Sequence, residues 1–230
     1  MKLLIAIPAL NEDGSIAAVL SQISQDLPEA TSLVIDDGST DKTAEIAKLN
    51  NAIVISMPFN VGVGGAMRVA FKYAYENNFT HVLQIDADGQ HLPSEAKQLI
   101  EYSSTSSVVV GSRFSKKDST YIVSGPRRAA MLLLAWVVSG ICKTKLSDVT
   151  SGFRIASGDA IEIFAREYPR EYLGDTVESL IIAHKYGIEI KEVHVQMKYR
   201  EFGVPSQNLI KSSWYLIRAL LMISLTVFKK

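Results

Sequence analysis

Two aspartates one residue apart, Asp86 and Asp88, follow an apolar run in the segment "IDADGQH". Like charges so close together make it costly to ionise both groups unless a cation or a proton lies beside them. Alternate side chains of an extended segment point the same way, so Asp86, Asp88 and Gln90 are expected to converge. Their oxygens suit a hard cation such as Mg²⁺ or Mn²⁺, which takes one or two carboxylates together with substrate phosphates. The alternative is a turn with aspartate caps before a helix at Pro93, with His91 either a further ligand or a cap facing solvent.

A second pair of acids, Asp36 and Asp37, ends another apolar run in "VIDDGSTD". A carboxylate at the end of a strand can accept hydrogen bonds from a nucleobase edge or a ribose. The alternative is turn chemistry alone, in which Asp41 caps the helix that follows.

The glycine-rich stretch "NVGVGGAMR" (60–68) matches a dinucleotide-binding fingerprint only in part. Met67 stands where the pattern G-x-G-x-x-G requires a glycine, and no Walker lysine follows. We interpret these glycines as a flexible start to a helix at 65–76.

Basic residues gather in the second half of the chain, and arginine is well suited to bidentate phosphate binding. The alternative is a solvated charged face. No nucleophile elbow, Cys/His pair or H-E-x-x-H motif occurs. Acids on one side and arginines on the other favour a reaction whose substrates already carry phosphates. The basic residues are Arg113, Lys116, Lys117, Arg127, Arg128, Lys143, Lys145, Arg154, Lys198 and Arg200.

These residues need a scaffold, and the first half of the chain supplies an alternating one. Apolar runs typical of strands buried on both faces alternate with amphipathic segments of helical length, which predicts a parallel sheet with right-handed crossovers. Ligands bind such sheets at the carboxyl ends of the strands, where the polar motifs fall, so one composite site is expected. The predicted strands are 3–7, 32–35, 52–56, 81–85 and 107–110, and the helices between them are 14–25, 41–49, 62–76 and 93–102. Helices at 127–142, 158–166 and 176–186 and a strand at 188–195 are expected to follow.

Composition sets wider bounds. The chain has 230 residues, 47% of them hydrophobic, which describes an ordinary globular protein without a separating linker. Lys and Arg balance Asp and Glu at 24 each, so no global field indicates nucleic acid. The single Cys142 agrees with a reducing compartment, and no signal peptide is visible. Uncharged runs at 129–142 and 219–228 are shorter than the ~20 residues that a membrane span needs.

The last 25 residues, 206–230, predict an amphipathic helix. Apolar residues recur at helical spacing, with basic residues between them and Trp214 and Tyr215 as interface anchors. This pattern is typical of a helix that lies in a membrane surface, which the helix at 129–142 could join. The alternative is a helix packed on a partner protein or on the sheet.

Taken together, "IPALNE", "IDDGSTD", "DADGQH", "GSRF" and "DVTSGFR" closely resemble the family-2 glycosyltransferases of the GT-A fold. Among them, the dolichyl- and polyprenyl-phosphate mannosyl- and glucosyltransferases are the most similar branch. The resemblance runs from Lys2 to about Gly203 and implies a GT-A domain over 1–205, followed by the amphipathic helix at 206–230. Its fold is α/β, a mostly parallel Rossmann-like sheet flanked by helices.

The resemblance also implies roles for individual residues. Asp88 and Gln90 match metal ligands for Mg²⁺ or Mn²⁺, and Glu178 falls where relatives carry an acid that faces the acceptor. Arginines that hold phosphates are matched by Arg113, Arg127 and Arg200. The positions that cradle the nucleotide or line the donor are matched by Pro8, Leu10, Glu12, Ile35, Asp37, Asp86 and Ala87.

The sequence departs from the family pattern at two places. Leu10 stands where the family often has Tyr. Gly203 is followed by "VPSQ", without the lysine of the family's R-x-x-G-x-S-K segment, for which Lys211 is a candidate substitute.

The implied function is an inverting, metal-dependent transfer of sugar from a UDP- or GDP-sugar to a polyprenyl phosphate. An anionic phosphate acceptor needs little help from a base, whereas a sugar hydroxyl would need one, and Glu178 or Asp175 are the candidates. The alternatives are transfer to a glycan or polysaccharide intermediate and a non-catalytic subunit that binds nucleotide sugar. The implied location is peripheral, on the cytoplasmic face of the membrane. A small membrane-protein partner and a homo-oligomer are left open.

Overall fold

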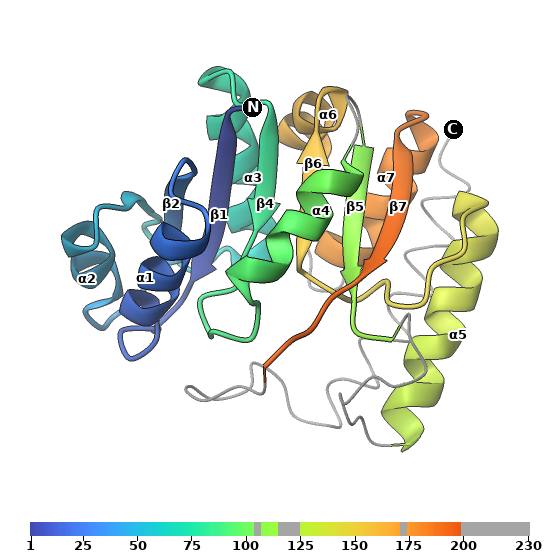
Figure 1. Ribbon diagram of the computed structural model, residues 1–230, viewed down its shortest axis with the longest axis horizontal. Helices are drawn as coiled ribbons and strands as arrows, with labels where there is room; N and C mark the ends of the chain where they lie inside the picture. The colour runs from blue at the N-terminus through green and yellow to red at the C-terminus, as the bar shows by residue number, and fades with distance from the viewer. Residues whose placement is uncertain (104–106, 115–124, 171–173, 199–230) are drawn as a thin grey trace.

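The computed structural model describes residues 1–103, 107–114, 125–170 and 174–198. A seven-stranded sheet runs through this part of the chain with helices on both faces (Figure 1). The strands are β1 (Leu3–Ala9), β2 (Thr31–Asp36), β3 (Ile53–Ser56), β4 (His81–Gln84), β5 (Ser107–Ser112), β6 (Arg154–Ser157) and β7 (Glu189–His194). The helices are α1 (Ile16–Asp26), α2 (Thr43–Leu49), α3 (Gly62–Glu76), α4 (Ala96–Tyr102), α5 (Gly125–Cys142), α6 (Asp159–Glu167) and α7 (Ser179–Lys185). Two short turns complete the elements, the 3₁₀ turn η1 (Pro93–Glu95) and the π-helical turn η2 (Gly174–Glu178).

The strand order is β3-β2-β1-β4-β6-β5-β7. Strands β1 to β4 pair in parallel, as the alternating pattern predicts. Strand β6, which the sequence pattern did not predict, lies between β4 and β5 and is antiparallel to both. Because β5 and β7 pair in parallel, β6 alone reverses direction among these seven strands. The predicted α/β class with a mostly parallel sheet is therefore confirmed.

Each face of the sheet carries its own hydrophobic core. Successive strand residues point to opposite faces, so Leu4 and Ala6 pack on the side of α3, α5, α6 and α7, whereas Ile5 and Ile7 pack on the side of α1 and α4. Burial on both faces explains why β1, β2, β4 and β5 read as continuous apolar runs. The same expectation for β3 was wrong, because β3 is an edge strand and is partly exposed.

The chain leaves β1 toward β2 and β3 and then returns to β4 on the other side of β1. This reversal of strand order makes a crevice beyond the carboxyl ends of β1 and β4, the usual place for a ligand in an open α/β sheet. The domain predicted at 206–230, with its amphipathic helix, lies outside the described residues.

Candidate active site

The loops after β1 and β2 are joined by hydrogen bonds into one unit. The amide of Asn11 donates to the Ser39 hydroxyl at 3.0 Å, and the Thr40 amide donates back to the Asn11 side-chain oxygen at 2.8 Å. The Glu12 amide donates to the Thr43 hydroxyl, also at 2.8 Å. Asn11 has a φ of 54°, a left-handed conformation that asparagine tolerates better than most residues. The two acidic and polar motifs are therefore one preformed rim.

The residues predicted to cradle the nucleotide fall into two groups, one partly exposed at this rim and one buried beneath it. Leu10 is 39% exposed and Glu12 is half-buried, so both present side chains to a ligand. Pro8 and Ile35 are register partners in β1 and β2, and both are buried, as is Ala87. Ile35 and Ala87 belong to the hydrophobic cores, so they support the edge from below.

Asp37 is buried at the start of α3. Its two carboxylate oxygens accept the amides of Val61 at 2.7 Å and Gly62 at 2.9 Å. Burial raises the pKa of Asp37 above its ordinary value, while the two amide hydrogen bonds act in the opposite direction. The first amides of α3 are thereby occupied by a side chain of the protein.

The glycine-rich stretch is structural, as the sequence interpretation favoured, but the structure explains it by close packing rather than by a flexible start to the helix. Gly62 has a φ of +79°, which a residue with a side chain rarely adopts. A Cβ at Gly64 would lie 2.3 Å from the Pro169 carbonyl oxygen, and one at Gly65 would lie 2.7 Å from a Val61 methyl carbon. Gly64 thus lets α3 approach the segment after α6, and Gly65 leaves room for the Val61 side chain.

The segment with the two aspartates is a turn, which corrects the expectation of an extended strand. Strand β4 ends at Gln84, Ala87 and Asp88 form a turn, and Gly89 follows with a φ of +76°. The Asp88 carboxylate accepts the Gln90 amide at 3.0 Å, the short-range bond by which aspartate favours turns. Convergence of the side chains therefore depends on this turn, which we call the acidic turn (residues 86–91).

Asp86 is held in place from two sides. The Gln84 side-chain amide donates to its carboxylate at 3.0 Å, and the main chain of Gly152 passes close by. A Cβ at Gly152 would lie 2.9 Å from the Gln84 amide nitrogen and 3.4 Å from an Asp86 carboxylate oxygen. Gly152 comes just before β6, so the antiparallel strand starts at this edge of the sheet and delivers the segment "DVTSGFR" to it.

His91 is buried behind the acidic turn and does not face solvent. Its ring stacks on Phe153 with the centroids 4.9 Å apart, and its Nδ1 accepts the Asp86 amide at 3.0 Å. The sequence left its function open between ligand and cap, and the structure shows it bonded to the main chain of the turn.

The oxygen donors of the acidic turn fit a divalent cation completed by a substrate. Asp88 is 8% exposed and the Asp86 side chain is 38% exposed, while Gln90 is half-buried. In the part of the chain that the structure describes, no three His, Cys, Asp or Glu side chains gather to hold an ion. Mg²⁺ commonly takes only one or two carboxylates and fills its remaining positions with water and phosphate oxygens.

Arg113, predicted to hold phosphates, forms a bidentate pair with Asp148 of the "DVTSGFR" segment. Its Nε lies 2.6 Å from one Asp148 oxygen and its Nη2 lies 2.8 Å from the other. Burial alone would raise the pKa of Asp148, but the hydrogen bonds and charge of Arg113 hold that pKa below its ordinary value. Arg113 keeps 13% of its side chain exposed, so the pair fixes its direction at the end of β5.

The structure does not describe the side chains of the other two predicted arginines. Arg127 belongs to the first turn of α5, but its side chain is not described, and Arg200 lies outside the described residues. The chain before Arg200 is described as far as Lys198, whose amide donates to the Gln90 carbonyl at 3.0 Å. The main chain at Lys198, two positions before Arg200, therefore lies beside the acidic turn.

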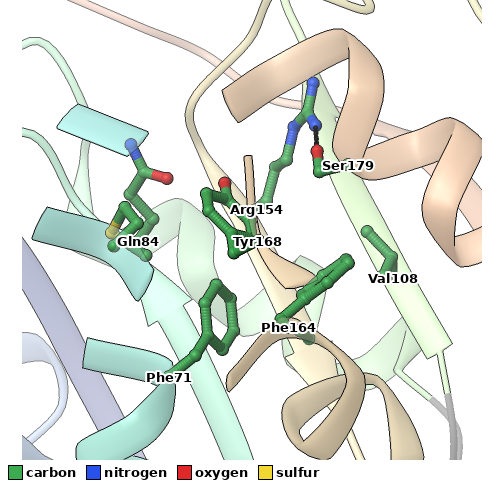
Figure 2. Close-up of a pocket in the computed structure, with 9 residues that line it drawn as sticks. Phe71, Gln84, Val108, Arg154, Phe164, Tyr168 and Ser179 are labelled. Carbon is green, nitrogen blue, oxygen red and sulfur yellow. Dashed lines mark hydrogen bonds between the residues drawn. The ribbon is translucent and has the colours of Figure 1, made fainter. Parts of the chain in front are cut away.

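Arg154 is a buried cation that joins the "DVTSGFR" segment to η2 and α7. It donates to the carbonyls of Ser151 at 2.7 Å and Val149 at 2.7 Å. On the other side it donates to the Thr176 carbonyl and to the Ser179 hydroxyl, the latter at 3.0 Å (Figure 2). Burial lowers the pKa of Arg154 from its ordinary value, and neighbouring Tyr168, Asp175 and Asp148 counter this.

Arg154 also borders a cavity of about 10 Å³, room for roughly one water. Figure 2 shows Arg154 and Tyr168 between Gln84 and Ser179, above the rings of Phe71 and Phe164. Glu178 and Asp175, the predicted acids of the acceptor side, both lie on η2, with Glu178 half-buried and Asp175 buried. Arg154 thus sets where these two acids lie relative to β4. The cavity is lined by Met67, Phe71, Gln84, Val108, Arg154, Ala156, Phe164, Tyr168 and Ser179.

Sequence reasoning gave no role to Asp148 and Gln84, which shape the site, and it placed Arg154 among cations facing phosphate or solvent, whereas Arg154 is buried. Asp148 lies in a motif that was recognised, but its partner Arg113 is 35 positions away. Gln84 sits in an apolar run, and a buried amide two residues before Asp86 was the available signal.

Residues 4–159 match the family described as Glycosyl transferase family 2. The chain belongs to this family. It is 29% identical to undecaprenyl-phosphate mannosyltransferase of Micrococcus luteus over 88% of this chain and 86% of that protein. It is 26% identical to UDP-N-acetylglucosamine–dolichyl-phosphate N-acetylglucosaminyltransferase of Methanococcus voltae, over 95% of this chain and 94% of that protein. Family membership makes the protein a glycosyltransferase.

The fold agrees with solved structures. Glucosyl-3-phosphoglycerate synthase from Mycobacterium tuberculosis, in complex with Mn²⁺, UDP and phosphoglyceric acid, superposes with a TM-score of 0.71 at 20% identity. The match covers 98% of this chain and 78% of that one. The predicted GT-A architecture is thereby confirmed. Among the described residues, no helix combines the length and apolar character needed to cross a membrane.

Proposed function

We propose that this glycosyltransferase moves a sugar from a nucleoside diphosphate sugar to a polyprenyl phosphate, with inversion at the anomeric carbon. The observation that carries the proposal is that an acidic, oxygen-rich turn after β4 and the arginine Arg113 at the end of β5 lie at the same edge of the sheet. Curated relatives that match nearly the whole chain are named for transfer to undecaprenyl and dolichyl phosphate, which supports this acceptor class.

The donor half of the reaction belongs to the first four strands. The rim of Leu10, Glu12 and Asp37 lies at the ends of β1 and β2, where a nucleoside would meet it. Asp86, Asp88 and Gln90 would hold Mg²⁺ or Mn²⁺ together with the diphosphate. When bound, that cation would neutralise charge on the departing diphosphate. The structural neighbour solved with Mn²⁺ and UDP supports this donor class.

The acceptor half needs positioning more than proton transfer. A phosphate oxygen is already anionic, so it can attack the anomeric carbon as the bond from that carbon to the diphosphate oxygen breaks. Arg113, together with the predicted contacts of Arg127 and Arg200, would orient the phosphate for this in-line attack. Glu178 and Asp175 would then serve packing and charge balance rather than act as a base.

The membrane surface is proposed as the place where the acceptor is met. Helix α5 exposes 52% of Leu132, 52% of Leu133 and 75% of Trp136. Its first turns extend past the strand ends, on the side of the sheet edge that carries the site (Figure 1). Apolar side chains with a tryptophan suit the interface of a bilayer, and the segment at 206–230 is proposed to join them. The location proposed is the cytoplasmic face.

The test is sugar transfer from a panel of UDP- and GDP-sugars to a short polyprenyl phosphate, with Mg²⁺ or Mn²⁺ and with a chelator. The proposal predicts an organic-extractable product from one donor, lost when the chelator is present. Transfer to a glycan acceptor and none to the lipid phosphate would refute the proposed acceptor.

A further inference from the structure

His91 lies immediately after the predicted metal ligands, yet its side chain points into the protein. It is 5% exposed, and its ring packs face to face on Phe153 at 4.9 Å and 22°. Phe153 is fully buried in the core on the side of α1 and α4. The ring is therefore fixed by a wall that does not belong to the acidic turn.

In that fixed position the His91 ring is hydrogen-bonded to the main chain of Asp86. Its Nδ1 accepts the Asp86 amide at 3.0 Å and closes a loop of six residues. Because an amide can only donate, Nδ1 carries the lone pair, and the proton of the neutral ring lies on Nε2. Nε2 lies 3.6 Å from a carboxylate oxygen of the same Asp86, which places that N–H toward the acid.

The main chain of His91 is anchored independently. It forms a β-bridge with Met197, and the neighbouring Gln90 carbonyl accepts the Lys198 amide at 3.0 Å. These contacts come from the segment after β7. His91 is thus held through its backbone by one part of the chain and through its ring by another.

We propose that His91 is a positioning residue that fixes Asp86 and the acidic turn in the geometry that binds the donor. The deciding contact is the hydrogen bond from the Asp86 amide to Nδ1. The Gln84 amide, 3.0 Å from the other Asp86 oxygen, and the bare main chain of Gly152 complete the setting. The inference rests on the proposed function only in that the turn binds a cation and a nucleoside diphosphate.

The competing explanation is a histidine that merely fills core volume. The two accounts differ in which atom matters. A volume filler is replaced well by phenylalanine, which keeps the stack on Phe153. A positioning residue is replaced well only by a side chain that keeps an acceptor at the place of Nδ1.

Asparagine and glutamine separate these accounts because they carry the same amide on stems of different length. The side-chain oxygen of Asn reaches about where Nδ1 lies, whereas the amide of Gln reaches about where Nε2 lies. The variants are H91N, H91Q and H91F. H81N is the matched control, since His81 lies at the opposite end of β4 and its ring contacts the exposed Thr80 hydroxyl at 2.9 Å.

The first readout is binding of Mn²⁺ with UDP and with GDP, followed by water-proton relaxation, and the second is kcat against KM for transfer. H91N is expected to stay within ~3-fold of wild type, whereas H91Q and H91F should weaken Mn²⁺–nucleotide binding by ~10–100-fold, the usual cost of losing a partner behind a metal ligand. H81N should match wild type. Thermal melting of each variant shows which of them are folded.

H91F with wild-type binding and turnover would overturn the inference, as would H91N no better than H91Q. If H91F does not fold, the comparison of H91N with H91Q decides alone. The proposed function fails separately. A wild-type protein that binds Mn²⁺–nucleotide in a His91-dependent way, yet transfers no sugar to polyprenyl phosphate, would refute the acceptor and leave the function of His91 intact.

Discussion

Two buried aspartates, one in each half of the sheet, respond to burial in opposite ways. Asp37, beside β2, is held by the neutral amides of Val61 and Gly62, and burial raises its pKa. Asp148, beside β5, is buried at least as deeply, yet its pairing with Arg113 outweighs burial and lowers its pKa. Neutral donors hold an acid in place, whereas a guanidinium also keeps it charged.

The difference describes how the two halves are built. On the donor side, the loops after β1 and β2 and the start of α3 are joined by hydrogen bonds from neutral amides, between residues 24 to 31 positions apart. On the acceptor side, the charged guanidinium groups of Arg113 and Arg154 join residues 35 and 22 positions apart. The first half is a preformed cradle, and the second is a set of oriented cations.

The largest effect is expected from D148A on the acceptor side. It leaves Arg113 mostly buried without its carboxylate, and breaking a buried pair on one side typically costs about 3–5 kcal/mol of stability. Urea unfolding measures the loss. D13A is the control, because Asp13 is an exposed acid on the donor rim. A D148A protein as stable as D13A would show that the ion pair does not hold the acceptor half together.

On the donor side, D88N should remove activity while the fold survives. The variant keeps an oxygen for the Gln90 amide but loses the charge for the cation, and kcat should fall by roughly 10²–10³-fold, as when one stabilising group is removed from an active site. Steady-state transfer and circular dichroism measure the two properties, with E101Q, a change at an exposed acid of α4, as control. Undiminished turnover would remove the acidic turn from the reaction.

The close contact between α3 and the segment after α6, which joins the two halves, is tested by G64A. A Cβ at Gly64 would lie 2.3 Å from the Pro169 carbonyl oxygen, so α3 must move away from the segment after α6, at a cost of about 1–3 kcal/mol. G140A is the matched control in helix α5, where a Cβ would meet nothing within 4 Å. It should gain about 0.5–1 kcal/mol from helix propensity. Equal effects of both variants would show that the close approach is unimportant.

Acidification should separate the two aspartates in sign. Asp148, with its lowered pKa, contributes stability above the unfolded value of about 3.9, and loses it as pH falls through its folded pKa. Asp37, with its raised pKa, contributes stability at low pH and loses it as pH rises from about 3.9 through its folded pKa. Urea unfolding of wild type, D37N and D148N across this range should therefore give differences from wild type with opposite slopes. Slopes of one sign would contradict the comparison.

The smallest effect is expected from E178Q. If the acceptor is an anionic phosphate, no base is required and kcat should change by less than ~3-fold, far below the ~10²–10⁴-fold that general-base catalysis supplies. Steady-state transfer by the variant, with its melting temperature as the folding control, measures this. A loss in the larger range would move the proposed acceptor to a sugar hydroxyl.

The sequence predicted the donor half well because its information is local. Strands β1 to β4 are apolar runs, and each polar motif follows the strand that positions it. The acidic turn was wrongly expected to be extended, because Gly89 and the bond from the Gln90 amide to Asp88 bend the chain there. The local hydrogen bond of Asp88 and the conformation of Gly89 therefore determine the shape of this segment, rather than the alternation of its side chains.

The acceptor half was harder to predict because strand β6 and the buried guanidinium contacts depend on partners that no local pattern indicates. Strand β6 has four residues and follows a turn, and it exists because β4 and β5 pair with both of its edges. The partners Arg113 and Asp148 lie 35 positions apart. The inward orientation of the His91 ring depends on its stacking against Phe153, a residue that lies close to His91 only in the folded protein.

The central claim is that the protein positions a phosphate acceptor rather than deprotonating a hydroxyl. The most direct test compares a polyprenyl phosphate with the free polyprenol of the same chain length, using the donor that gives product. The account predicts transfer to the phosphate and none to the alcohol. Transfer to the alcohol at a comparable rate would contradict it.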